Sequence, residues 1–310
     1  MSYPQSVRLR EVGPRDGIQS EKAVVPTADK IRLINALSST GIRRIEAVSF
    51  VSPRALPQMA DAGAVLTGIE RNPEVFYSAL VPNRKGAEAA VDANADGMQV
   101  FIAATDSYNL KNVRKTVAES LNDVAEVAEL GRDSGVPVEA TISTSFGDPD
   151  EGDVAPQRVL ELSRWMLDHG LGAISYGDTT GMATPRRVAE LVEALSGHGL
   201  PGLDINMHFH DTRGTGLANV VTALQLGVDY FDAAVGGMGG SPFASEASGN
   251  IATEDLVHML DDMGVATGVD LGALIAAADI AQGFVEGELP GKVLRAGPRA
   301  GGRGRPGVER

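Results

Sequence analysis

Short runs of β-branched and apolar residues alternate eight times with longer segments of helical periodicity in this chain of 310 residues. The alternation is typical of βα units built around a parallel sheet. The predicted strands cover residues 7–12, 44–49, 75–80, 97–103, 136–143, 173–176, 204–210 and 230–235. The predicted helices include residues 27–39, 113–134, 156–169 and 185–196, with 253–263 and 271–281 after the last strand. No linker interrupts the repeats, so we predict an α/β protein, a (β/α)8 TIM barrel with additional C-terminal helices.

The turn after the first predicted strand argues against an open, doubly wound sheet. It reads Gly13-Pro-Arg-Asp-Gly17, which lacks the glycine spacing of a dinucleotide-binding loop. We therefore predict one barrel domain over residues 1–285. Residues 286–310 are predicted to form a flexible tail, because glycine, arginine and proline dominate its sequence from residue 296 onward.

Composition excludes several classes of function. A net charge of −14 argues against nucleic acid or an anionic membrane surface as the main partner. The chain has no cysteine, which rules out disulfides, thiolate metal ligands and a thiol nucleophile. No apolar run is long enough to span a bilayer, and the first strand begins by Val7, which leaves no room for a signal peptide. The expected location is the cytoplasm.

Two of the five histidines, His208 and His210, lie two residues apart. Successive side chains in a strand point to opposite faces, so these imidazoles project to the same side with Phe209 between them. Asp211 and a turn containing Gly214 follow directly. The pattern suits half of a divalent-metal site. The alternative is a hydrogen-bonded histidine pair at the end of a strand.

Polar residues gather where the predicted strands end. In an α/β barrel these ends meet at one rim and form the active site. An isolated Asp or Thr more often caps a helix, but convergence on one rim favours a site. The residues are Arg15, Asp16, Glu46, Ser49, Asn83, Thr141, Ser143, Ser145, Asp178, Thr179, His208, His210 and the glycine-rich stretch 236–241.

Five motifs in this sequence are specific enough to indicate a family. They are Glu11-Val-Gly-Pro-Arg-Asp-Gly-Ile-Gln-Ser-Glu-Lys22, Ser49-Phe-Val-Ser-Pro-Arg54, Gly177-Asp-Thr179, His208-Phe-His-Asp211 and Ala247-Ser-Gly-Asn-Ile-Ala-Thr-Glu-Asp-Leu256. Together they resemble the motifs of the 3-hydroxy-3-methylglutaryl-CoA lyases, a family of metal-dependent TIM-barrel enzymes. The resemblance extends from about Val7 to about Phe284.

The resemblance implies a divalent cation bound by Asp16, His208, His210 and Asn250. Two imidazoles and two oxygens suit Mg²⁺ or Mn²⁺ best, with Zn²⁺ and Co²⁺ as alternatives. The sequence leaves other roles open for two of these ligands. Asp16 could cap a helix, and Asn250 could serve a turn with Gly249.

The implied reaction is retro-aldol cleavage of a 3-hydroxyacyl-CoA thioester to acetyl-CoA and a keto acid. Resemblance places Arg15 near the thioester carbonyl, where its charge would stabilise the enolate; an ion pair with Glu46 or Asp16 is its structural alternative. Glu46 and Asp178 are the carboxylates expected to position Arg15 and to transfer the hydroxyl proton, or only to orient neighbours. The expected substrate-binding residues are Gln19, Lys22, Ser49, Asn83 and Thr179.

One position departs from the family pattern. Where the family has Gly-Leu-Gly-Gly-Cys-Pro-Tyr-Ala, this chain has Gly237-Met-Gly-Gly-Ser-Pro-Phe-Ala244, so that Ser241 replaces the cysteine expected to protonate the enolate. A hydroxyl is a far weaker acid than a thiol. Ser241 could therefore act through a water molecule or only shape the loop.

Other functions stay open at this level. The substrate could be a relative such as citramalyl-CoA or a longer 3-hydroxy-3-alkylglutaryl-CoA. The chain could also be a Claisen-type acyl-CoA synthase or a non-catalytic barrel that binds CoA esters. The expected partners are an acyl-CoA thioester and a second copy of the chain in a homodimer, with no nucleic acid and no membrane.

Overall fold

Eight parallel strands close into a barrel in the order of the sequence, β1 to β8, with β1 paired to both β2 and β8. The computed structural model describes residues 3–240 and 249–299. The strands are β1 (Arg8–Glu11), β2 (Arg44–Ser49), β3 (Phe76–Leu80), β4 (Gly97–Ala103), β5 (Val138–Ser143), β6 (Ala173–Gly177), β7 (Asp204–His208) and β8 (Tyr230–Ala233). The predicted (β/α)8 barrel is confirmed.

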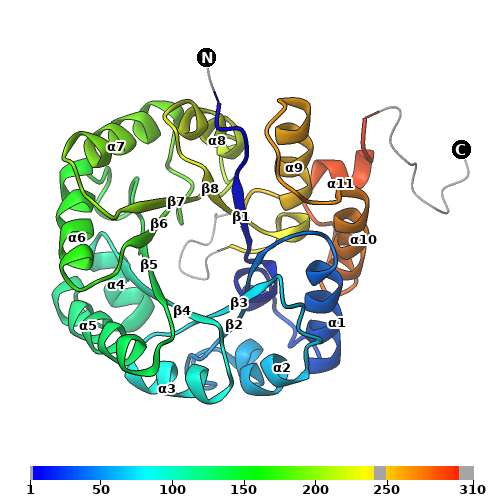
Figure 1. The fold of residues 1–310 in the computed structure, drawn as a ribbon, viewed down its shortest axis with the longest axis horizontal. Coiled ribbons are helices and arrows are strands. Elements are labelled where there is room, and N and C mark those ends of the chain that lie inside the picture. The colour runs from blue at the N-terminus through cyan, green and yellow to red at the C-terminus, as the bar shows by residue number, and fades with distance from the viewer. Residues whose placement is uncertain (1–2, 241–248, 300–310) are drawn as a thin grey trace, which may run out of the picture.

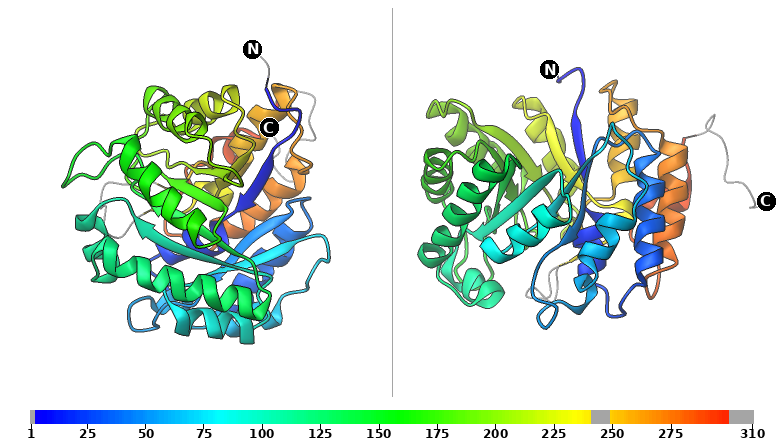
Figure 2. Two further views of the ribbon diagram at one scale, coloured as in Figure 1. Left: turned by 60° about the vertical axis from the view of Figure 1, so that its left-hand side comes forward. Right: turned by 60° about the horizontal axis from the view of Figure 1, so that its bottom comes forward.

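The helices lie outside the strands and surround them, as Figures 1 and 2 show. They are α1 (Thr27–Ser38), α2 (Ala62–Gly68), α3 (Arg84–Asp92), α4 (Asp106–Val113), α5 (Val117–Ser134), α6 (Pro156–Asp168), α7 (Pro185–Gly197), α8 (Gly216–Gln225), α9 (Thr253–Asp262), α10 (Leu271–Gln282) and α11 (Lys292–Ala296). Three short turns, η1 (Gly13–Gly17), η2 (Pro57–Met59) and η3 (Val235–Gly237), complete the set. The predicted C-terminal helices are thus present, and α10 packs beside α1 (Figure 1).

The helix predicted over residues 113–134 ends at Ser134 as predicted but begins later, at Val117. Arg114 adopts a left-handed conformation with φ of 60°, which ends α4. A new helix then begins after Thr116, whose side chain accepts a hydrogen bond from the Glu119 amide while Glu119 bonds back to the Thr116 amide. This capping box satisfies two backbone donors at once and fixes the start of α5.

The seventh strand is shorter than predicted and ends at His208. His210 instead forms an isolated antiparallel bridge with Asn250, a residue from beyond the eighth strand. The segment after β8 therefore folds back over the end of β7. This return brings His210 next to Asn250, a residue 40 positions later in the sequence.

Polar side chains fill part of the barrel interior, where branched apolar residues are the usual filling. Arg10 on β1 is fully buried and pairs in register with Asp232 on β8. Its guanidinium donates to both carboxylate oxygens of Asp232 and also to Gln99 and Glu139. Breaking such a buried pair costs about 3–5 kcal/mol because it leaves a charge unpaired, so this cluster fixes the strands relative to one another.

Packing continues beyond the predicted domain boundary at residue 285. Leu289, Val293 and Leu294 are buried, and α11 lies against α9. Residues 286–299 therefore belong to the folded unit. The predicted flexibility of residues 300–310 concerns positions outside the described residues.

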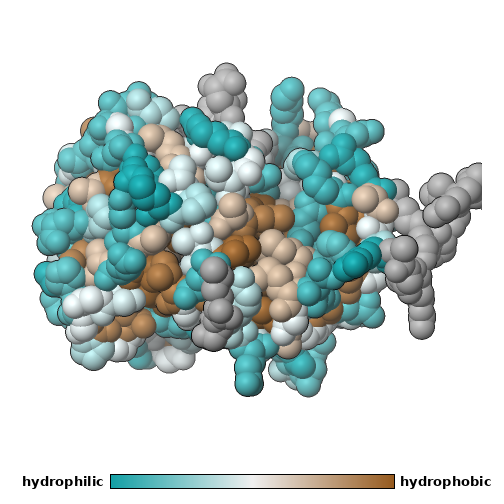
Figure 3. All heavy atoms as spheres, turned by 90° about the horizontal axis from the view of Figure 1, so that it is seen from above, coloured by the Kyte–Doolittle hydropathy of each residue, from teal (hydrophilic) through white to brown (hydrophobic). Residues whose placement is uncertain are grey.

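Hydrophilic side chains cover most of the face seen in Figure 3, and apolar ones gather near its middle. No helix in residues 3–240 or 249–299 is both long and apolar enough to cross a membrane.

Candidate active site

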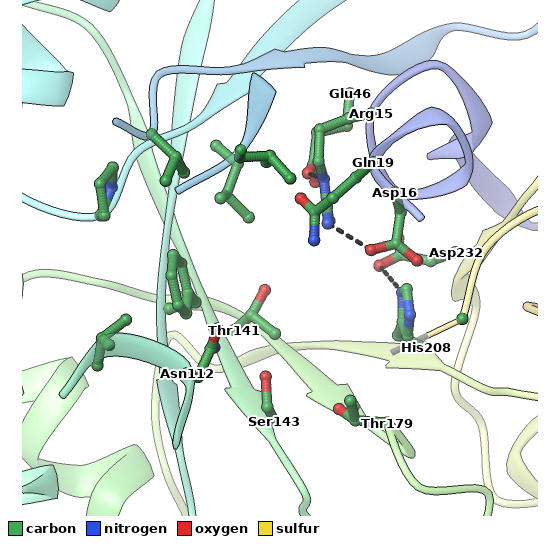
Figure 4. Close-up of a pocket in the computed structure, with 18 of the residues that line it drawn as sticks. Arg15, Asp16, Gln19, Glu46, Asn112, Thr141, Ser143, Thr179, His208 and Asp232 are labelled. Atoms are coloured by element: carbon green, nitrogen blue, oxygen red, sulfur yellow. Dashed lines mark hydrogen bonds and ion pairs between the residues drawn. The ribbon is translucent and has the colours of Figure 1, made fainter. Parts of the chain in front are cut away.

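A cavity of about 190 Å³ opens at the carboxyl ends of the strands, where the sequence predicted the site (Figure 4). Its volume lies below the roughly 300–1,000 Å³ of typical ligand pockets. One wall is polar and the other carries apolar side chains. The residues that line it are Arg15, Asp16, Gln19, Glu46, Val51, Ala55, Leu56, Leu80, Pro82, Phe101, Tyr108, Asn112, Val113, Thr141, Ser143, Gly177, Thr179, His208, His210, Asp232 and Gly240.

Asp16, His208 and His210 form a compact cluster of buried metal-ligand types on the polar wall. One ligand atom from each lies within 4.8 Å of the others. The two Nε2 atoms face each other 3.2 Å apart, a separation that two imidazole nitrogens reach when they are directed at a common point. The cluster joins the turn after β1 to the end of β7.

Asn250 completes this group of residues. Its Nδ2 donates to an Asp16 oxygen over 2.7 Å, and its buried Oδ1 has no hydrogen-bond partner among the described residues. An unpaired buried oxygen is costly unless something binds it. Two imidazole nitrogens, one carboxylate and one amide oxygen fit a divalent cation by donor chemistry, and Asp16, His208 and His210 fit one by position as well.

Arg15 lies between the carboxylates of Asp16 and Glu46 and donates to both. Burial alone would lower the pKa of this guanidinium, but Glu46 and then Asp16 outweigh burial and hold the pKa above its ordinary value. Burial opposes ionisation of Asp16 as well, yet Arg15 and the two histidines bring the pKa of its carboxyl below the usual range. The pocket thus holds a fixed positive charge next to a carboxylate that stays ionised.

Hydroxyl groups from β5 and from the segment that follows β6 line the pocket wall opposite Arg15 (Figure 4). Thr141 Oγ1 accepts a hydrogen bond from Gln99 Nε2 over 2.7 Å, and Thr179 Oγ1 accepts one from the Thr144 amide over 3.3 Å. Each hydroxyl therefore keeps its own hydrogen available for an oxygen in the cavity. Thr179 and Gln19 are the predicted substrate-binding residues that the structure places in the pocket.

Other predicted site residues do not line the pocket. Asn83 is exposed and caps α3 by accepting a hydrogen bond from the Gly86 amide. Lys22 is exposed on the loop before α1. Ser49 is buried, and its Oγ has no hydrogen-bond partner among the described residues. Ser241 lies outside the described residues.

Asp178 is fully buried behind the pocket. Its Oδ1 accepts a hydrogen bond from the Ala183 amide over 2.8 Å, so the carboxyl closes the loop before α7. Burial raises the pKa of this carboxyl to about 7. These contacts fit the alternative reading, in which Asp178 orients its neighbours.

The sequence did not single out Asp232, which lines the pocket and contacts His208. A carboxylate inside the otherwise apolar strand 230–235 was the available signal, because a charge in a buried strand needs a partner. Asn112 and Tyr108 on α4 were also missed. They belong to the segment that the prediction treated as a loop before a single helix.

Two buried carboxyls, those of Glu11 and Glu254, lie beneath η3, the turn that leads into the glycine-rich loop. Glu11 accepts hydrogen bonds from the Gly13 and Val235 amides, and Glu254 accepts one from the Gly236 amide. Burial raises the pKa of Glu11 to about 7 and that of Glu254 to about 8. The folded state therefore favours the protonated form of both carboxyls.

We expect the stability of the protein to fall between pH 5 and pH 8 and Glu254→Gln to flatten this fall. Unfolded Glu254 ionises near 4.5 and folded Glu254 near 8, so the folded state binds the extra proton in between and is favoured at the lower pH. The effect amounts to about 1–4 kcal/mol. Urea unfolding of both proteins at each pH measures it. The exposed Glu88→Gln serves as the control, and equal pH slopes for wild type and Glu254→Gln would contradict the assignment.

Comparison with known proteins identifies the family. The HMGL-like family model matches residues 6–281. Hydroxymethylglutaryl-CoA lyase YngG of Bacillus subtilis is 43% identical over 95% of this chain and 98% of its own length. The mitochondrial hydroxymethylglutaryl-CoA lyase of Gallus gallus is 47% identical over 88% of this chain and 92% of its own.

Solved structures agree with these matches. The crystal structure of the Bacillus subtilis HMG-CoA lyase superposes with a TM-score of 0.92 at 43% identity, covering 96% of this chain and 99% of that one. An HMG-CoA lyase from Acinetobacter baumannii, solved in complex with coenzyme A and 3-methylmalate, gives 0.92 at 41% identity over 99% and 100% of the two chains. The family model over most of the chain and these matches along nearly its whole length, together with a cluster of residues able to hold a metal, show that the chain belongs to the HMGL-like family.

Proposed function

We propose that this protein cleaves 3-hydroxy-3-methylglutaryl-CoA to acetyl-CoA and acetoacetate with the help of a divalent cation. The observation that carries the proposal is the placement of Arg15 directly beside the Asp16, His208 and His210 cluster in one cavity. A retro-aldol cleavage needs both an activated hydroxyl and a stabilised enolate. The pocket offers groups for each within a few ångströms.

The cation, Mg²⁺ or Mn²⁺ by its oxygen and imidazole ligands, would supply Lewis-acid polarisation of substrate oxygens. Asp16, His208, His210 and Asn250 are the residues that would hold it. In our proposal Arg15 binds the thioester oxygen and stabilises the negative charge that develops there as the carbon–carbon bond breaks. Glu46 holds the guanidinium in this orientation.

The hydroxyl wall has a separate task in this proposal. Thr141, Ser143 and Thr179 donate hydrogen bonds to the oxygens at the far end of the acyl group, which fixes the bond to be broken between them and Arg15. Two carboxylates were predicted to transfer the hydroxyl proton. Of these, Glu46 lines the pocket, and we assign the proton transfer to it. Asp178 is assigned to positioning the loop before α7.

A panel of 3-hydroxyacyl-CoA thioesters tests the substrate. The purified protein is incubated with 3-hydroxy-3-methylglutaryl-CoA, citramalyl-CoA and 3-hydroxy-3-alkylglutaryl-CoAs, with and without EDTA, and products are identified by mass spectrometry. We expect acetyl-CoA and acetoacetate from the first thioester in the metal-replete sample alone. Cleavage that persists after full chelation would defeat the proposed mechanism, and faster cleavage of another thioester would reassign the substrate.

We expect Ser241→Cys to retain or raise the turnover number, by up to about 100-fold if protonation of the enolate limits the rate. A thiol with a pKa near 8.5 gives up its proton far more readily than a hydroxyl. The measurement is kcat for the variant and for Ser241→Ala as its matched control. Loss of activity in Ser241→Cys with intact metal content would count against a role for this position in proton transfer.

We also propose that the protein acts in the cytoplasm as a homodimer, as the family resemblance and the sequence suggest. Light scattering of the purified chain tests the assembly, and a mass equal to one chain would reject it.

A further inference from the structure

Asp232 on β8 is buried beneath the metal-ligand cluster and accepts five hydrogen bonds. Arg10 Nε and Nη2 donate over 2.8 and 2.7 Å, Asn206 Nδ2 over 2.7 Å, Ser175 Oγ over 3.1 Å and His208 Nδ1 over 3.1 Å. The four donor residues lie on three strands, β1, β6 and β7. Such a carboxylate has no freedom to rotate or to move away from His208.

We propose that Asp232 is a positioning residue that directs Nε2 of His208, and not Nδ1, to the metal ion. The inference rests on the metal site of the proposed function. A neutral imidazole carries one N–H, and an ionised carboxylate only accepts hydrogen bonds. The hydrogen of His208 must therefore lie on Nδ1, which leaves the lone pair on Nε2 (Figure 4).

The geometry at the other nitrogen agrees with this assignment. His208 Nε2 lies 3.2 Å from His210 Nε2 and within the cluster that includes Asp16. Were the hydrogen on Nε2 instead, it would occupy the centre of the ligand cluster. The carboxylate would then face a bare Nδ1 lone pair over 3.1 Å, which is repulsive.

Arg10 makes the carboxylate a reliable acceptor. Two N–H groups of its permanently charged guanidinium donate to the two oxygens of Asp232, which favours the ionised form of the carboxylate. Arg10 is in turn held by Gln99 and by Glu139, which pairs with Arg44 near the opposite end of the barrel. A continuous series of ion pairs and hydrogen bonds therefore connects Arg44, at the start of β2, to the proposed metal ligand His208.

The affinity for Mn²⁺ tests the role of the carboxylate. Asp232→Asn keeps the shape but turns an NH₂ group toward Arg10 or toward His208, whichever way the amide rotates. We expect the dissociation constant for Mn²⁺, measured from the electron paramagnetic resonance signal of the free ion, to rise about 10–100-fold. Ser175→Ala is the matched control. It removes another hydrogen bond to Asp232 without touching the imidazole, so we expect a constant within about twofold of wild type.

Nitrogen NMR of the wild-type protein gives a test that needs no variant. With ¹⁵N-labelled histidine and bound Mg²⁺, His208 should show a protonated Nδ1 and an unprotonated Nε2, and Asp232→Asn should lose this pattern while near-ultraviolet circular dichroism stays native. A protonated Nε2 in the wild type, or an unchanged Mn²⁺ affinity in a folded Asp232→Asn, would overturn the inference. A wild-type protein that binds no divalent cation at all would instead overturn the proposed function.

Discussion

We expect replacement of Arg15 with methionine to lower kcat by about 10³-fold and to leave divalent-cation binding intact. Removal of one donor to a developing oxyanion costs about 10²–10³ in rate, and Arg15 brings a full charge in addition to its donors. Methionine has a similar length and no charge, so it keeps the shape of the pocket while removing the stabilisation. Asp16 loses a competing ion pair and remains free for the cation.

Steady-state kinetics and metal analysis of Arg15→Met measure the two halves of this expectation. Arg8→Met is the matched control, because Arg8 forms ion pairs with Asp204 and Asp229 at the outer end of β1 and is 45% exposed. We expect wild-type kcat for that variant. A kcat for Arg15→Met within tenfold of wild type would show that the guanidinium only balances the charge of Glu46 and Asp16.

We expect replacement of His210 with alanine to abolish metal-dependent turnover and to weaken cation binding by at least about 100-fold. The substitution removes one nitrogen donor from a set of four proposed ligands, while the backbone bridge between residues 210 and 250 can remain. The polarisation supplied by a bound cation is worth several kcal/mol in rate. The loss should persist at saturating Mn²⁺.

The measurement for His210→Ala is Mn²⁺ titration followed by assay of the reconstituted protein. His198→Ala provides a control, because His198 is an exposed residue at the end of α7. Full activity of His210→Ala at high Mn²⁺ would remove His210 from the ligand set and leave Asp16, His208 and Asn250 as the site.

The alternating pattern of the sequence predicted the strands well, since burial and local propensity act together there. The predicted bounds of β2 and β4 agree with the structure at both ends. The prediction was poorest where a side chain competed with the backbone pattern. The hydrogen bonds between Thr116 and Glu119 set the start of α5. The spacing of apolar residues alone does not predict where this start lies.

The site was predictable as far as motifs reach. The spacing of His208 and His210 indicated half of a metal site, the family resemblance added Asp16, and the structure brings the three residues together. Asp232 was missed because Arg10, Ser175 and Asn206, which surround it, lie on strands far apart in sequence. The periodicity of the sequence also does not predict the direction in which a loop side chain points.

The ligands Asp16 and Asn250 are 234 positions apart, yet their side chains touch. At a synthesis rate of about 5–20 residues per second, a ribosome that has made the first ligand needs about 10–50 s more to deliver the last. A nascent chain thus exposes Asp16, His208 and His210 to cellular metals before Asn250, the fourth proposed ligand, has been synthesised. Cation loading should follow release from the ribosome, so that metal retention reports a finished barrel rather than an emerging one.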